Sequence, residues 1–177
     1  MKLSKLQETI LYIISEAQEN GLKPLSKFQL MKLIYLLQVE SLKFTGSPFL
    51  DEPRFLRYQR GPLSPQIYDA LSGLDGKYIK INEITNKEYG HNKQEHILVK
   101  LPKLNLSRSE QIFINSVLKD YLSLTQTKLG DVVYKTEPMA KIVEYEKQNH
   151  ASMNGYQLDM SSIPLDEDVL EGMVTTP

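Results

Sequence analysis

Apolar residues in the first quarter of the chain recur with the period of a helix. Between residues 3 and 20 they repeat every three or four positions, with charged residues opposite. Ser26 and Gln29 have the spacing of a capping box, so a second helix is expected to begin there. That helix, over 27–42, has almost no polar face. The pattern therefore predicts an amphipathic first helix and a central, buried second helix.

Turn-forming residues divide the next part of the chain into short elements. The sequence at 45–48 is expected to end the central helix. A short helix is predicted over 51–58, because an acidic pair followed by proline suits a first helical turn. Ser64 is placed to cap a further helix over 65–73, whose first residue is proline.

The period changes to strict alternation between residues 77 and 101. Apolar and polar residues alternate around Ile79 and again around Val99, which predicts two antiparallel strands. The polar stretch 86–94, with Gly90, is expected to be their loop. A β-hairpin is thus attached to a helical body.

Helical patterns return after the hairpin. Ser107 and Glu110 form a second capping box, and further helices are expected over 127–134 and 138–148. A connector at 150–162 leads to one or two final helical turns.

The predicted fold is mainly α, helix-dominated α+β, with a small two-stranded antiparallel hairpin. Residues 1–148 are expected to form one compact multi-helix domain, with the hairpin at about 77–101 and an acidic C-terminal extension at 149–177.

Charge is distributed unevenly along the 177 residues. Residues 148–177 have five acidic and no basic side chains, a charge of -5, whereas residues 1–147 have 21 basic and 17 acidic ones, a charge of +4. Nucleic-acid binders usually have a larger excess of Lys and Arg, so nucleic acid is not the expected partner. No apolar run is long enough to span a membrane and no signal peptide is recognisable, so we expect a cytoplasmic protein.

Residues that carry chemistry are sparse. Cysteine is absent, which excludes disulfides, thiolate zinc sites and thiol nucleophiles. The three histidines, His91, His96 and His150, do not have a known metal-site spacing. No nucleophile elbow or phosphate-binding loop occurs. We therefore expect no enzymatic activity, no metal and no cofactor.

One constellation has the residue types that are enriched at protein interfaces. Two of its members share a face of the helix predicted over 51–58, and all are candidate partner-binding residues: Arg54, Arg57, Tyr58 and Arg60. In the alternative interpretation, the arginines pair with acids such as Glu52 and Asp69 and lie over the core.

Several strings resemble the Panacea domain, a phage-associated family also called the SocA-like antitoxin domain. They occur in the family's order, and the Gly-Pro string is the most specific: 30–37 (LMKLIYLL), 44–49 (FTGSPF), 60–63 (RGPL) and 67–71 (IYDAL). The resemblance covers roughly residues 5–148. It implies an antitoxin that neutralises an adjacently encoded toxin by direct binding, and some relatives deliver the toxin to an ATP-dependent protease. It assigns structural roles to five motif residues: Tyr35, Gly46, Gly61, Pro62 and Pro138.

The chain departs from the family pattern near its end. Family members commonly carry Thr-His followed by Pro-Trp, but here Tyr134 and Met139 occupy the positions of the His and the Trp. Any role of that histidine is therefore not transferred to this chain.

Two other functions remain open. Short helices followed by a hairpin could form a winged helix that binds the protein's own operator, although the helix over 65–73 presents Gln66, Tyr68, Asp69 and Ser72 rather than basic side chains. The chain could also be a phage-associated module that binds a protein other than a toxin.

Overall fold

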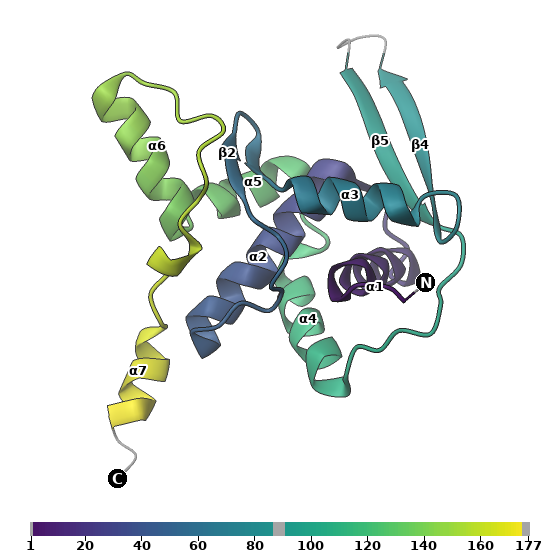
Figure 1. Ribbon diagram of the computed structural model, residues 1–177, viewed down its shortest axis with the longest axis horizontal. Coiled ribbons are helices and arrows are strands. Elements are labelled where there is room, and N and C mark those ends of the chain that lie inside the picture. The colour runs from purple at the N-terminus through teal and green to yellow at the C-terminus, as the bar shows by residue number, and fades with distance from the viewer. Residues whose placement is uncertain (1, 87–90, 175–177) are drawn as a thin grey trace.

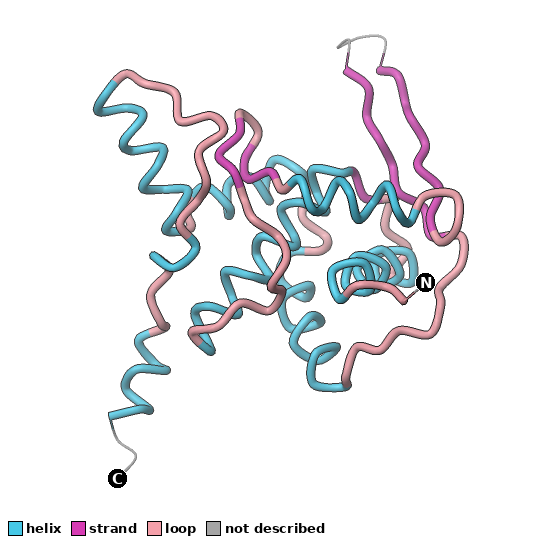
Figure 2. Tube along the Cα trace, viewed as in Figure 1, coloured by secondary structure: helices cyan, strands magenta, loops and turns pink. Residues whose placement is uncertain are grey.

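Helices make up most of the fold, and the strands form two small sheets (Figures 1 and 2). The computed structural model describes residues 2–86 and 91–174. The helices are α1 (Lys5–Glu19), α2 (Lys27–Thr45), α3 (Pro65–Leu74), α4 (Arg108–Tyr121), α5 (Gln126–Tyr134), α6 (Glu137–Asn149) and α7 (Glu167–Val174), with a 3-10 turn, η1, at Met160–Ser162. The strands are β1 (Leu25–Ser26), β2 (Leu56–Tyr58), β3 (Gly61–Leu63), β4 (Ile79–Asn86) and β5 (His91–Leu98).

The central helix α2 organises the core, as predicted. Its N-terminus is fixed by the expected capping box, in which the Ser26 hydroxyl accepts from the Gln29 amide and the Gln29 side chain accepts from the Ser26 amide. Every residue from 31 to 39 is buried. Gly46, at φ 72°, ends the helix in the left-handed conformation that glycine adopts readily. Because α4, α5 and β3 all pack on α2, a helix without a polar face is stable here.

The predicted hairpin at 77–101 forms, and it belongs to a larger sheet. β4 and β5 pair antiparallel from Ile79↔Leu98 to Asn86↔His91, and β1 adds a third strand through Leu25↔His96. The predicted loop was too long, since both strands continue into 86–94; Gly90 lies outside the described residues. In Figure 1 the outer ends of β4 and β5 project from the helical body.

The order of elements around this sheet is that of a winged-helix domain. Apart from β2 and β3, the elements follow one another as α1, β1, α2, α3, β4 and β5, and the sheet order is β1-β5-β4. The β2–β3 hairpin is inserted between α2 and α3. The body therefore has winged-helix topology with the β2–β3 hairpin added to it.

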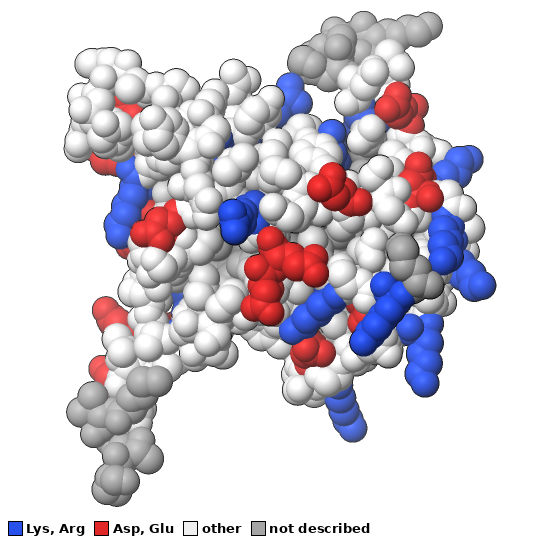
Figure 3. Space-filling view, in the orientation of Figure 1, with Lys and Arg blue, Asp and Glu red and all other residues white. Residues whose placement is uncertain are grey.

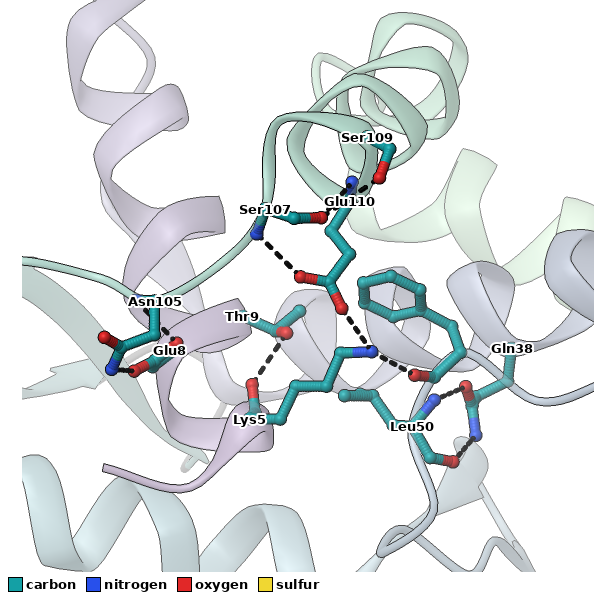
Figure 4. A network of polar contacts seen from close by, with 10 residues as sticks. Lys5, Glu8, Thr9, Gln38, Leu50, Asn105, Ser107, Ser109 and Glu110 are labelled. Atoms are coloured by element: carbon teal, nitrogen blue, oxygen red, sulfur yellow. Dashed lines mark hydrogen bonds and ion pairs between the residues drawn. The ribbon is translucent and has the colours of Figure 1, made fainter. Parts of the chain in front are cut away.

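The prediction of a helix over 51–58 is wrong. The chain crosses α2 in an extended loop and enters β2 at Leu56, so the acidic pair and Pro53 begin no helix. The Gln38 side chain donates to the Leu50 carbonyl (2.6 Å) and accepts from its amide (2.8 Å), as Figure 4 shows. Phe55 then packs edge-on against Tyr35, with ring centroids 5.2 Å apart. The backbone of 55–58 finds its hydrogen-bond partners in β3 and in the returning chain at 155–158, where a helix would have supplied them locally.

A second polar network joins α1 to α4 (Figure 4). The Lys5 ammonium donates to the Phe49 carbonyl (3.0 Å) and forms an ion pair with Glu110 (2.8 Å). Glu110 also completes the predicted capping box with Ser107. The hydrogen bonds from Lys5, followed by that from the Ser107 amide, lower the pKa of the Glu110 carboxyl. One carboxylate therefore caps α4 and fastens it to α1.

The helix over Pro65–Leu74 forms as expected, but its cap differs. Ser64 occupies the N-cap position without accepting a hydrogen bond from the helix, and its hydroxyl instead donates to Gln66 Oε1 (3.0 Å).

The C-terminal extension returns to the body after α6. Its residues 155–158 run alongside β2, with Leu158 donating its amide to the Phe55 carbonyl (2.8 Å). The side chains of Leu158 and Ile163 join the core. The predicted final helix forms as α7, with acidic residues in its first turn. Among the described residues, no helix is both long and apolar enough to cross a membrane.

His96 is buried in the three-stranded sheet, and its two ring nitrogens are treated unequally. Nδ1 lies 3.1 Å from the Leu25 carbonyl oxygen, while Nε2 has no hydrogen-bond partner among the described residues. Burial lowers the pKa of His96. The folded protein therefore binds a proton less readily at this site than the unfolded chain does.

Stability is expected to decrease as pH falls from about 7.5 to about 5.5, through the ordinary histidine pKa of about 6.5. Above that pH both states are neutral at His96, and below it the unfolded chain gains the proton first. Urea unfolding at several pH values measures the slope. His96→Phe should flatten it, while His150→Asn, at an exposed helix end, should leave it unchanged; equal slopes in all three proteins contradict the assignment.

Candidate protein-binding site

The β2–β3 hairpin presents a two-residue turn, Gln59 and Arg60, to solvent. Tyr58 pairs with Gly61, whose φ of 112° is accessible to glycine and strained for other residues. Arg54, Tyr58 and Arg60 of the predicted partner-binding residues are exposed. The turn is therefore an accessible surface with a defined backbone.

Arg57 is buried, unlike the other three candidates. Its Nε and Nη2 donate to the two carboxylate oxygens of Glu146 at 3.1 and 3.0 Å, a bidentate ion pair between β2 and α6. It also contacts the Tyr58 carbonyl oxygen and lies over the Tyr134 ring, 5.7 Å from its centroid. Arg57 and Arg54 share no helix face, because Arg57 lies in a strand. The role that the structure gives Arg57 is to hold the hairpin in place.

Glu146 and Tyr134 are site residues that the sequence did not indicate. Hydrogen bonds from Arg57 lower the pKa of the Glu146 carboxyl, which also accepts from the Met153 amide (2.9 Å). The Tyr134 hydroxyl donates to the Gln59 carbonyl (3.3 Å). Glu146 is 89 positions from Arg57, so no local pattern connects them. Together these contacts fix the hairpin from behind.

Exposed tyrosines mark the elements that the Arg57–Glu146 pair joins. Tyr58 on β2, Tyr145 on α6 and Tyr156 beside β2 are 45%, 49% and 59% exposed. Tyrosine offers a large, rigid contact area at interfaces. The surface around the Arg57–Glu146 pair is therefore a candidate for protein binding.

A cluster of cations surrounds Phe28 at the start of α2. The Lys27 and Lys32 ammonium groups lie 5.4 and 5.9 Å from the ring centroid, and the Arg60 guanidinium lies 5.6 Å from it. We call Lys27, Phe28, Lys32 and Arg60 the Phe28 cluster. It adjoins the hairpin through Arg60.

Lys32 is the unusual member of the Phe28 cluster, because its side chain is buried, at 4% exposed. Among residues 2–86 and 91–174, no carboxylate forms an ion pair with any of the three cations. Burial, and then the charge of Arg60, lower the pKa of Lys32. Burying an ammonium costs several kcal/mol, and a cation–π contact returns about 0.5–2 kcal/mol. The ammonium keeps some contact with solvent, because His96 Nε2 is the one enclosed side-chain nitrogen or oxygen without a partner among the described residues.

Two glycines adjoin the Lys32 side chain, and a pocket opens beside Phe28 and Arg60. The Lys32 stem passes between Gly61 of β3 and Gly130 of α5, where an added β-carbon would lie 3.6 and 3.9 Å from Lys32 Cε. A pocket of about 310 Å³ opens beside the cluster and is lined in part by Phe28 and Arg60. The sequence contained a signal here, since Lys32 is the one charged residue between positions 28 and 39.

Metal-ligand side chains do not converge in the part of the chain that the structure describes: no three histidine, aspartate or glutamate residues lie close enough to hold an ion.

Residues 30–138, more than half of the chain, match the family model described as "Antitoxin SocA-like, Panacea domain". The chain belongs to this family. The matched segment of the Panacea domain runs from α2 to the start of α6 and contains Lys32, the β2–β3 hairpin and Tyr134. No curated protein matches the chain.

Each of the five motif residues of the Panacea domain is either buried or has a positive φ angle. Tyr35 is fully buried, Gly46 and Gly61 have the positive φ angles described above, and Pro62 and Pro138 are buried in β3 and in the first turn of α6. Met139, at the position of the family's Trp, is also fully buried. Tyr134, at the position of the family's His, supports the hairpin turn.

Proposed function

We propose that this protein is the antitoxin of a toxin–antitoxin pair and neutralises its toxin by direct protein–protein binding. Membership of the SocA-like antitoxin family carries the proposal. The exposed hairpin, fixed by Arg57, Glu146 and Tyr134, is the surface that best suits it. Blockade needs a stable surface and no chemistry of its own.

Preorganisation of the hairpin matters for affinity. Suppressing a toxin in a cell calls for about nanomolar binding, or about 12 kcal/mol. A surface that is already ordered loses little conformational entropy when it binds, so more of the contact energy appears as affinity. Tyr58 and Arg60 lie on such a surface and are the proposed anchors.

Co-expression with the open reading frame beside its gene tests the function. We expect the neighbouring product to arrest growth alone, and this protein to restore growth and to co-purify with it. A neighbour that is harmless, or growth rescue without a complex, contradicts neutralisation by direct binding. A stable complex with a harmless neighbour would instead favour a phage-associated module with another partner.

The anchor residues are tested by Tyr58→Ala combined with Arg60→Glu. We expect this double variant to keep the fold and to bind the toxin at least tenfold more weakly, about 1.4 kcal/mol, by calorimetry. Ile112→Ala with Lys119→Glu, a matched pair of exposed residues on α4, should bind normally. Unchanged affinity in the hairpin variant removes the hairpin from the interface.

Delivery of the toxin to an ATP-dependent protease, which the family resemblance implies, stays a prediction. A pulse-chase of the toxin with and without this protein would reveal it as a shortened toxin half-life.

Operator binding is a second candidate because the topology is that of a winged helix. The helix expected to enter the groove, α3, has Asp69 as its one charged residue. On the face in Figure 3, acidic and basic side chains are interspersed, and several acids lie near the centre of the view. A gel shift with the protein's own promoter at low salt decides: retention of the DNA supports this function, and free DNA at micromolar protein excludes it.

A further inference from the structure

We propose that the Phe28 cluster is a receptor for a single carboxylate of the protein partner, which supplies the counter-ion that the described residues do not give Lys32. The choice of a protein as the source of the carboxylate rests on the proposed function. The site consists of the Lys32 ammonium, the Arg60 guanidinium and the Phe28 ring, with Lys27 at the edge of the pocket.

An anion is indicated because Lys32 differs from the other buried charged residues. Arg57 has its carboxylate in Glu146, and the buried Glu8 accepts from the backbone and side chain of Asn105 at 3.0 and 2.7 Å. Lys32 has a second cation, Arg60, as its charged neighbour and no acid in the described chain. Two adjacent cations without an acid are stabilised when an anion binds between them.

The local geometry favours a carboxylate. A guanidinium binds a carboxylate through two parallel hydrogen bonds, and Arg60 lies on an exposed turn that can reach an incoming group. The Phe28 ring provides an apolar contact for the methylene groups of a glutamate or aspartate. Gln126, whose side-chain oxygen accepts from Ser26 (3.1 Å), lies on the pocket wall and offers further hydrogen bonds.

Acidic residues around the pocket disfavour a nucleic-acid backbone. Glu83 lines this pocket, and Asp69 and Asp75 line the adjoining one. Lys93, the remaining base on the wall, is already paired with Glu95 at 3.2 Å. A chain of phosphates would extend past all of these acids, whereas a single carboxylate is near Glu83 alone.

Gly130 provides an independent observation. A glycine inside a helix is destabilising, yet α5 has one at the position that faces the Lys32 stem. The nearest atom to an added β-carbon is Lys32 Cε at 3.9 Å, so packing does not require glycine there. A larger side chain at this position would lie against the end of the Lys32 side chain, whereas glycine leaves that side uncovered.

The test is an NMR titration of the full-length protein with N-acetyl-glutamate N-methylamide. We expect saturable shifts of the Gly61 and Gly130 amide signals, and none with the neutral glutamine analogue. Lys32→Met should weaken binding at least tenfold and leave the melting temperature equal or higher, because it removes an unpaired buried charge. Lys128→Met, on the exposed side of α5, should bind as the wild type does.

Arg60→Gln, on the exposed turn, gives a second readout if Lys32→Met fails to fold, and should also weaken binding at least tenfold. The proposal is overturned if the wild type shows no saturable shift, if the folded variants bind as the wild type does, or if inorganic phosphate or a short DNA duplex binds tenfold more tightly than the glutamate probe. The titration uses no toxin, so its outcome and that of the co-expression experiment can fail separately.

Discussion

Replacing Glu146 with alanine is expected to lower the free energy of unfolding by about 3 kcal/mol, because it leaves the buried Arg57 guanidinium without its carboxylate. The two side chains are 11% and 17% exposed, so water replaces the lost partner poorly. The Met153 amide loses its acceptor at the same time. Urea unfolding measures the change. Glu144 is exposed and lies two positions earlier on the same helix. Glu144→Ala should lower the free energy of unfolding by less than about 0.5 kcal/mol.

The same ion pair predicts a dependence on pH. The folded-state pKa of Glu146 lies below its ordinary value, so its contribution is present at neutral pH and is lost as pH falls through that lowered value. The difference between wild type and Glu146→Ala should therefore shrink in acid. Arg57→Met combined with Glu146→Met should recover most of the stability. A loss in Glu146→Ala no larger than in the Glu144 control would show that the pair is not an anchor.

Gln38→Leu is expected to cost about 3 kcal/mol, because two buried backbone groups lose their hydrogen bonds together. The leucine has a similar size, so the change isolates the polar contacts to the amide and carbonyl of Leu50, a residue that is 2% exposed. Thermal and urea unfolding both report the loss. Gln148→Leu, on the exposed side of α6, is the matched control and should change little. A loss below about 1 kcal/mol would mean that water or a shift of the loop satisfies Leu50.

Local signals predicted the helices well. The capping boxes at Ser26 and Ser107 each involve residues three positions apart, so the sequence contains the whole interaction. The alternation around Ile79 likewise reports a strand with one face on the core. For each of these elements, the residues that determine it lie close together in the sequence.

The strand at 56–58 could not be predicted in this way. Its residues pair with β3 on one side and with 155–157 on the other, almost a hundred positions away. The acidic pair and proline before it are helix-start residues, but the contacts of Gln38 and Phe55 override that preference. The partner of Arg57 was missed for the same reason.

The candidate site could therefore be predicted only in part from the sequence. Arg60 and Tyr58 are exposed, and their partner-binding role stays a prediction, whereas Arg57 was expected on a helix face and lies buried in a strand. Lys32 was present as a lone charge on an otherwise uncharged face, yet its significance depends on Arg60, Gly61 and Gly130, which come from other elements.

Because the returning chain at 155–158 forms one flank of β2, the turn that carries Tyr58 and Arg60 depends on the C-terminal extension. Truncating or unfolding the C-terminal extension would loosen that turn while α1, α2 and α4 stay folded. Under the proposed function, degradation from the C-terminus would therefore loosen the toxin-binding turn before the core itself is lost.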